Sequence, residues 1–255
     1  LQGDWSSDVC SSDLILYFMN FRFFIFAMLL MSAPLLNAQD FLDGATMFSH
    51  SKDAHFTLKT GETITAFVEN VKRKKGLISA IEIKDAAGKK TVLSPDKVKH
   101  MYLPPTGYDK LLRATDISNN VTKWDRDQSA HAQYIKGGYV YFEHTDVMVK
   151  KKKMSMMMQV INPGFADGIK VYFNPLAGDT GGLAVGGLQV TGGDDRSCYF
   201  KKGDKAAYLI DKKNYSKEVK NLYGDCPDVA KAFGNKFKWS EAAKHVAFYS
   251  ENCSK

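Results

Sequence analysis

The sequence predicts an α+β protein that is mostly β, with a small antiparallel β module, a second antiparallel β region and a C-terminal helical segment. Three observations predict this fold class. Apolar and polar residues alternate in short runs between residues 55 and 103. Further short runs rich in β-branched and aromatic residues, separated by Gly-rich turns, continue to about residue 211. Beyond residue 212 the apolar residues repeat every three or four positions, which is typical of helices.

The first 38 residues are interpreted separately from the fold. Residues 19–38, "MNFRFFIFAMLLMSAPLLNA", combine one arginine, an apolar run and a small-residue end, which is the pattern of a signal peptide. Because such a signal stands at the N-terminus, we interpret residues 1–18 as a non-native translated artefact. Residues 3–14 resemble the translation of a sequencing adapter. The alternative is a native extension with a membrane anchor, although the apolar run is short for a bilayer span.

Cleavage near Ala38 predicts a periplasmic or secreted chain that begins at Gln39. Loss of three aspartates and one arginine raises the formal net charge from +7 to +9. No second apolar run of about 18 residues follows, so we expect no transmembrane span in the mature chain. The N-terminal residue would be Gln39 and not cysteine, which argues against a lipid-anchored lipoprotein.

Residues 39–104 are predicted to form the N-terminal β module. Ile64, Ala66 and Val68 alternate with Thr63, Thr65 and Phe67, and Ile81 and Ile83 flank Glu82. This period of two indicates strands with one buried face. An SH3-like barrel is one arrangement that the pattern allows.

Residues 105–133 are predicted to be a connection with a short helix in "YDKLLRATDI", and residues 134–211 the second β region. In that region "MSMMMQV" places four methionines in one predicted strand. Methionine sulfur can bind soft metals such as Cu(I). We favour the alternative that these methionines fill a core, because the flexible thioether side chain packs well in irregular apolar space.

Residues 212–255 are predicted to be helical, with two apolar stripes. The first contains Tyr215, Val219 and Leu222, and the second contains Trp239, Ala242, Val246, Tyr249 and Cys253. A short helix is expected between them, started by Asp225-Cys226-Pro227 and ended by Gly234. His245, beside Lys244, is expected to be a surface or boundary residue.

Cysteine usage predicts one structural disulfide. With Cys10 in the artefact, Cys198, Cys226 and Cys253 remain, an odd number for an oxidising compartment. Cys226 lies near the start of one predicted helix and Cys253 near the end of another. Antiparallel packing of these helices would bring the two together, whereas the sequence assigns no partner or redox state to Cys198.

The segment from Lys201 to Cys253 resembles the C-terminal half of a family of secreted proteins of unknown function from Bacteroidetes-type bacteria. The resemblance rests on "DCP" at Asp225 to Pro227 and on the later Tyr249 and Cys253. The segments "INPGF", "IKVYFNP", "GETITAFVENV" and "LSPDKVKHMY" are similar to the rest of that family, which usually has glycine where Ala66 stands. The resemblance implies the fold and export, and it implies no activity.

Motifs for catalysis or cofactor binding are weak. "GDTGGL" resembles a serine-protease loop but has Thr180 at the nucleophile position, and the glycines at 181–187 match no nucleotide fingerprint. Asp194 and Asp195 could bind calcium, although a solvated turn explains them as well. The six histidines lack zinc-site spacing. We therefore assign no catalytic, cofactor-binding or metal residues and expect no cofactor.

Two basic runs suggest a binding surface. They are Lys72, Arg73, Lys74, Lys75 and Lys150, Lys151, Lys152, Lys153. In a basic chain such runs can contact anionic envelope components, or they can simply be solvated hairpin turns that discourage edge pairing. No stacking platform of aromatic residues accompanies them, so specific nucleic-acid binding is not expected.

The function that we predict is an exported, non-enzymatic envelope protein that binds an anionic surface or has a structural role. One alternative is a secreted hydrolase with dispersed catalytic residues around Glu143, His144, Asp194 and Asp195. Another is a subunit of a cell-surface assembly. The sequence does not identify a ligand, a partner or an oligomeric state.

Overall fold

A computed structural model describes residues 40–107, 130–177, 184–185, 188–189, 197–234 and 236–254. Several predictions therefore lie outside the described residues. They are the artefact and signal peptide at 1–38, the short helix in the connection, the protease-like loop at Thr180, and the Asp194-Asp195 pair.

Six antiparallel strands form a closed barrel. Their spatial order is β2, β1, β5, β6, β7 and β3, and β3 pairs again with β2 to close the ring. Strand β4 pairs with the second half of β3. The bounds are β1 Asp53–Leu58, β2 Thr63–Lys74, β3 Leu77–Lys84, β4 Lys90–Leu93, β5 Val98–Leu103, β6 Val140–Val149 and β7 Lys152–Gln159. The barrel thus combines strands from both sides of the predicted connection.

Apolar side chains from alternate strand positions fill the barrel. Along β2, Ala66 and Val68 are buried, whereas Phe67 between them is only partly buried, as the period of two predicts. Phe48, which precedes β1, packs edge to face against Phe142 of β6 with ring centroids 5.6 Å apart. The interior is therefore a packed core with a contribution from the segment before the first strand.

A second antiparallel sheet lies against β7. Met157 of β7 belongs to the barrel core, whereas Met156 and Met158 pack with Tyr172 and Tyr199 of the second sheet. Both faces of β7 are therefore buried, and the prediction that these methionines fill a core is confirmed. The second sheet has the order β12-β11-β8, with β8 Ile169–Phe173, β11 Cys198–Lys202 and β12 Tyr208–Ile210; a separate short pair consists of β9 Ala184–Val185 and β10 Leu188–Gln189.

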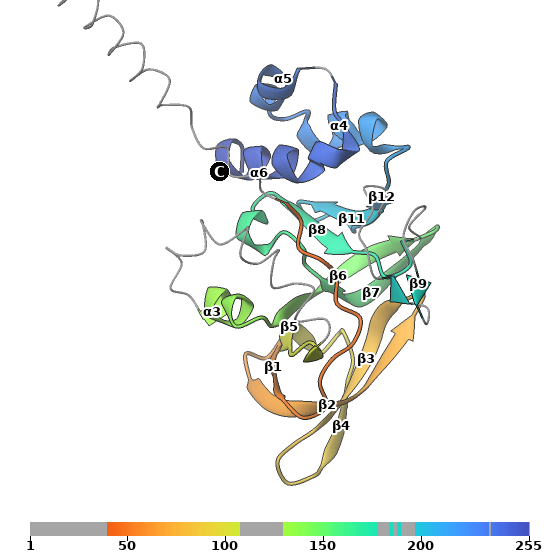
Figure 1. Cartoon of the computed structure of the whole chain (residues 1–255), viewed down its shortest axis with the longest axis vertical. Coiled ribbons are helices and arrows are strands. Elements are labelled where there is room, and N and C mark those ends of the chain that lie inside the picture. The colour runs from red at the N-terminus through yellow and green to blue at the C-terminus, as the bar shows by residue number, and fades with distance from the viewer. Residues whose placement is uncertain are drawn as a thin grey trace, which may run out of the picture. The chain divides into compact units, whose positions relative to one another are not determined.

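The C-terminal helices gather on the side of the second sheet away from the barrel (Figure 1). The helix that starts at Pro227 and ends before Gly234 is confirmed, and Gly234 adopts a left-handed φ of 67°. The fold is therefore mostly β with a helical C-terminal segment, as predicted. The helices are α3 Ala130–Lys136, α4 Tyr215–Tyr223, α5 Pro227–Phe233 and α6 Ala242–Asn252, with 3-10 turns η1 Pro163–Phe165 and η2 Trp239–Glu241.

Candidate functional site

The first basic run forms the turn of the β2–β3 hairpin. Lys74 pairs with Leu77, so Lys75 and Gly76 are a two-residue loop. Their φ angles are 53° and 78°, which is the left-handed geometry of the turns that best join twisted antiparallel strands. Glycine adopts this geometry freely, whereas lysine does so at a cost. The hairpin therefore holds Lys75 at its tip.

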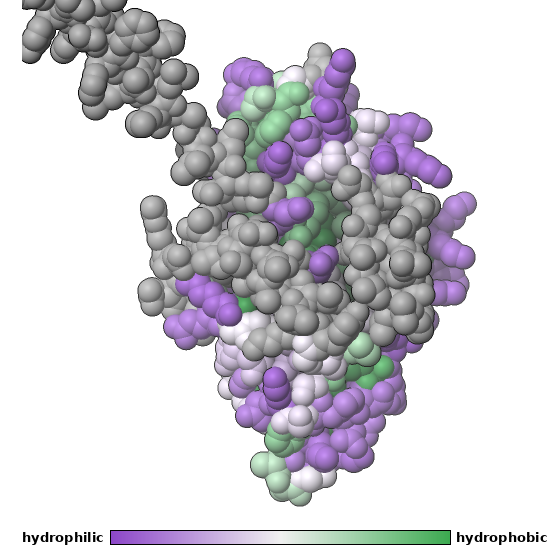
Figure 2. All heavy atoms as spheres, in the orientation of Figure 1, coloured by the Kyte–Doolittle hydropathy of each residue, from purple (hydrophilic) through white to green (hydrophobic). Residues whose placement is uncertain are grey.

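The second basic run forms the turn of the β6–β7 hairpin in a similar way. Val149 pairs with Lys152, which leaves Lys150 and Lys151 as the loop. Lys150 also has a left-handed φ, of 57°. Figure 2 shows hydrophilic side chains projecting along the edge of the molecule where this hairpin ends.

Two of the eight basic side chains are used within the fold. Arg73 donates from Nη1 to the carbonyl oxygen of Gly76 at 3.1 Å and from Nη2 to that of Thr46 at 2.8 Å. These bonds tie the turn to the segment before β1. Lys153 forms an ion pair with Asp146 at 2.8 Å.

The other six basic side chains are exposed. Among the described residues their ammonium groups form no hydrogen bond or ion pair, and no acidic residue lies within either run. They therefore concentrate positive charge at two turns. They are Lys72, Lys74, Lys75, Lys150, Lys151 and Lys152.

A polar network joins the barrel to the second sheet. Glu143 of β6 accepts hydrogen bonds from Lys170 at 2.8 and 3.0 Å, from Tyr172 at 2.6 Å and from Tyr141 at 3.3 Å. Its side chain is only 12% exposed, so these donors replace water around the carboxylate. Burial and then the nearby carboxylate raise the pKa of Tyr172. Through these hydrogen bonds the Glu143 side chain connects the barrel to the second sheet.

Glu143 and His144, which the hydrolase alternative combines, point to opposite faces of β6. Glu143 contacts the second sheet, whereas the Nε2 atom of His144 lies 2.6 Å from Ser155 Oγ and 3.4 Å from Lys59 Nζ. Burial and then the positive charge of Lys59 lower the pKa of His144. The described residues therefore do not bring this pair into one site.

Histidine and tyrosine rings pack on the outer face of the barrel beneath α3. Tyr102 stacks on Tyr134 of α3 with centroids 4.4 Å apart, and its hydroxyl lies 2.8 Å from Nδ1 of His131. His55 extends the cluster at 4.6 Å from Tyr134. The rings contact one another and hold α3 against the strands. Within the described part of the chain, no three His, Cys, Asp or Glu side chains are grouped so as to hold a metal ion.

The residues of the "DCP" segment meet the end of α6. Cys226 and Cys253 lie at disulfide distance, with Cα atoms 5.9 Å apart, a normal value for a disulfide. Next to them the Tyr249 hydroxyl donates to Asp225 at 2.8 Å, and Lys202 of β11 forms an ion pair with the same carboxylate at 2.5 Å. Burial acts to raise the pKa of Asp225, but these two hydrogen bonds outweigh it and lower the pKa. The predicted cysteine pair is therefore part of a clamp between α5, α6 and the second sheet.

His245 is buried in this helical segment, so the prediction that it is a surface or boundary residue is wrong. Its ring is 0% exposed and contacts Phe233 and Phe237, with centroids 4.6 and 4.9 Å away. Nδ1 lies 2.8 Å from the Tyr215 hydroxyl, whereas Nε2 has no hydrogen-bond partner among the described residues. Burial lowers the pKa of His245 to about 4. His245 is buried because it lies on the inward face of α6. Its neighbour in the sequence, Lys244, does not indicate which face of the helix His245 occupies.

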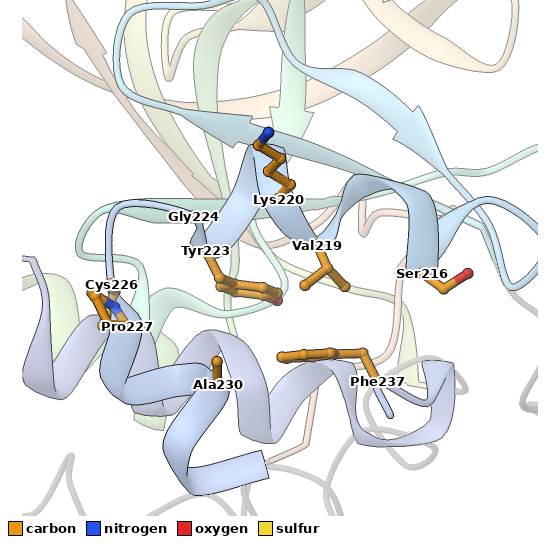
Figure 3. Close-up of a pocket in the computed structure, with 9 residues that line it drawn as sticks. All are labelled: Ser216, Val219, Lys220, Tyr223, Gly224, Cys226, Pro227, Ala230 and Phe237. Carbon is orange, nitrogen blue, oxygen red and sulfur yellow. The ribbon is translucent and has the colours of Figure 1, made fainter. Parts of the chain in front are cut away.

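A cavity of about 400 Å³ lies beside this aromatic cluster (Figure 3). Apolar groups of Val219, Tyr223, Ala230 and Phe237 border it, and Cys226 lies at its edge. In Figure 3 the Lys220 ammonium and the Ser216 hydroxyl point away from the space between the Tyr223 and Phe237 rings. These two polar groups are therefore not aimed into that space.

One exposed apolar residue lies next to the first basic turn and has no signal in the sequence pattern. Leu176, in the turn after β8, is 63% exposed, and its side chain lies over Gly76. The two segments are a hundred residues apart in the sequence, so only the tertiary structure brings them together.

Comparison with known proteins finds no matching family model, no matching curated protein and no matching solved structure. Among the described residues, no helix is both long and apolar enough to cross a membrane. The function is therefore inferred from the residues of this chain alone.

Proposed function

We propose that this protein is an exported, non-enzymatic binding module that contacts an anionic surface of the cell envelope through its two lysine-bearing hairpin turns. The observation that carries the proposal is the set of six exposed lysines without partners among the described residues. Side chains of this kind interact with anions in solution or on a surface, whereas Arg73 and Lys153 already have partners. The two hairpin turns present these charges to solvent at two defined places in the fold.

The magnitude expected for such a surface is substantial. A lysine close to an anionic lipid surface contributes about 1 kcal/mol at physiological ionic strength. The three free lysines of one turn would therefore contribute about 3 kcal/mol, or roughly a 150-fold gain in affinity. Because exposed charges are screened, binding should weaken strongly as salt increases.

Retention on immobilised heparin tests the charge-based part of the proposal. The test variant replaces the six free lysines with glutamine. The matched control makes the same change at six exposed lysines of the C-terminal segment, Lys213, Lys217, Lys220, Lys236, Lys238 and Lys244. We expect the test variant to elute at much lower salt than the control. Equal elution of the two variants would contradict the proposal.

Export is the second part of the proposal. It is supported by the signal-peptide pattern of residues 19–38 and by the Cys226–Cys253 pair, since disulfides persist in oxidising compartments. Expression from Met19 in a secreting bacterial host, followed by intact mass and thiol counting, tests it. We expect a mass that begins at Gln39 and one thiol that reacts after denaturation, from Cys198. Retention of residues 19–38, or three reactive thiols, would contradict export.

A further inference from the structure

We propose that the β2–β3 turn docks the protein onto an anionic lipid surface, with Leu176 inserted among the lipid headgroups between cationic side chains. This inference rests on the proposed function, because it names the partner of the first basic turn. It adds an apolar anchor that charge alone does not require.

Leu176 is the most exposed of the large hydrophobic residues in the described part of the chain. It is 63% exposed, compared with 48% for Val92 and 41% for Leu209. Leucine on a surface gains free energy only where it can leave water. An exposed leucine beside several lysines is therefore a pattern suited to a boundary between water and hydrocarbon.

The fold holds Leu176 in this exposed position. Its backbone N–H donates to the side chain of Asn174 at 3.1 Å, and the N–H of Ala177 donates to the carbonyl oxygen of Asn174 at 3.1 Å. Asn174 is itself only 6% exposed and donates to Ser197 at 2.9 Å. These hydrogen bonds hold the start of the turn from Asn174 to Ala177 in place. The turn in this way keeps the Leu176 side chain exposed.

The basic turn and Leu176 fit each other closely. A Cβ atom added to Gly76 would lie 2.7 Å from Leu176 Cγ, so any other residue at this position would displace the leucine side chain. Gly76 also has a left-handed φ of 78°. Glycine at this position therefore permits both the tight turn and the contact with Leu176, which lies next to Lys75 in consequence.

A lipid surface matches this combination better than other polyanions. Lysine ammonium groups pair with headgroup phosphates, and leucine enters the boundary between headgroups and acyl chains. Polysaccharides and nucleic acids offer the charge but no hydrocarbon. Single-stranded nucleic acids are bound largely by stacking on aromatic rings, and the basic run at residues 72–75 contains no aromatic residue.

The test compares binding of the purified exported protein to two kinds of vesicle. One contains phosphatidylglycerol and phosphatidylcholine, and the other contains phosphatidylcholine alone. The variants are Leu176→Ser, Lys74→Gln with Lys75→Gln, and Leu209→Ser as the matched control from β12. Heparin retention and binding of a single-stranded oligonucleotide are measured for each variant.

We expect binding to the anionic vesicles only. Leu176→Ser should weaken it about 10-fold, in keeping with the free energy of burying a leucine side chain, and leave heparin retention unchanged. The double lysine variant should weaken vesicle binding and heparin retention, and Leu209→Ser should remain within about twofold of the wild type. In a Leu176→Trp variant, tryptophan fluorescence should shift to the blue and be quenched by lipids that carry a spin label near the headgroup.

Other outcomes separate the two proposals. Retention on heparin or the oligonucleotide without binding to anionic vesicles would overturn the lipid inference and leave the charge-based function intact. Equal vesicle binding by Leu176→Ser and the wild type would also overturn it. If the wild-type protein bound neither heparin nor anionic vesicles, both the proposed function and the lipid inference would be overturned.

Discussion

Replacing His245 with glutamine is expected to remove a large part of the sensitivity of this protein to acid. The neutral ring is buried among Tyr215, Tyr223, Phe233 and Phe237. Protonation of both ring nitrogens would bury a positive charge and leave the Nε2–H group without an acceptor among the described residues. Burial therefore lowers the pKa to about 4 from the ordinary value of 6.5, although nearby Glu241 acts to raise it.

The sign of the effect follows from the two pKa values of His245. Between pH 6.5 and pH 4 the unfolded chain takes up a proton at His245 while the folded protein does not. Acid therefore favours the unfolded state in this window, and the stability is fully present above it. The loss attributable to His245 is about 1 kcal/mol at pH 5.5 and about 2 to 3 kcal/mol at pH 4.5, relative to neutral pH.

Urea unfolding at pH 7.5, 5.5 and 4.5 measures this loss, with fluorescence of Trp239 as the probe, because its ring lies 5.4 Å from that of Tyr215. In His245→Gln the free energy of unfolding should fall less between pH 7.5 and 4.5 than in the wild type, by about 2 to 3 kcal/mol. His245→Phe provides a second side chain that does not titrate. A wild-type slope in both His245 variants would refute the reasoning.

Three further predictions concern stability and are measured by denaturant unfolding at neutral pH. Reduction of Cys226–Cys253, or replacement of both by alanine, should lower the free energy of unfolding by about 3.5 kcal/mol in the chain-entropy model, since 27 residues separate the two; a loss below about 1 kcal/mol would argue against the clamp. Lys150→Gly should raise the free energy of unfolding by about 0.5 to 1 kcal/mol, because glycine accepts the left-handed φ of 57°; a decrease would contradict this turn geometry. Glu143→Leu should lower it by about 2 kcal/mol by removing the acceptor of the Lys170 ammonium, and the added change Lys170→Leu should recover part of the loss. The single variant Lys170→Leu completes the cycle, and a loss in the double variant equal to the sum of the two single losses would exclude coupling between the two side chains.

The sequence predicted those parts of the fold that depend on local periodicity and turn chemistry. Alternation at Ala66 and Val68 gave the buried face of β2, because side chains of a strand point to opposite faces by geometry alone. Pro227 and Gly234 marked the ends of α5 for equally local reasons. Proline has a restricted φ that suits the first turn of a helix, and glycine has a free backbone that suits its end. The Cys226–Cys253 pairing could be expected because the two cysteines lie at opposite ends of predicted helices that antiparallel packing would bring together.

Closure of the barrel was not predictable in this way. The expected N-terminal module ended at residue 104, yet β6 and β7 complete the ring after the connection. Hydrophobic alternation indicates that a strand has a buried face, but it does not indicate which other strand pairs with it. Pairing between distant strands depends on the whole chain, so it is decided only in the tertiary structure.

Some features of the candidate site likewise follow from the sequence, whereas others appear only in the tertiary structure. The amino-acid sequence by itself determined where the positive charge is concentrated, because runs of lysine follow directly from the order of the residues. Only the tertiary structure decided which charges are free, since Arg73 and Lys153 find partners that lie elsewhere in the chain. It also decided that Leu176 lies on the turn at Gly76 and that His245 is buried, because contacts and burial arise when distant segments pack together.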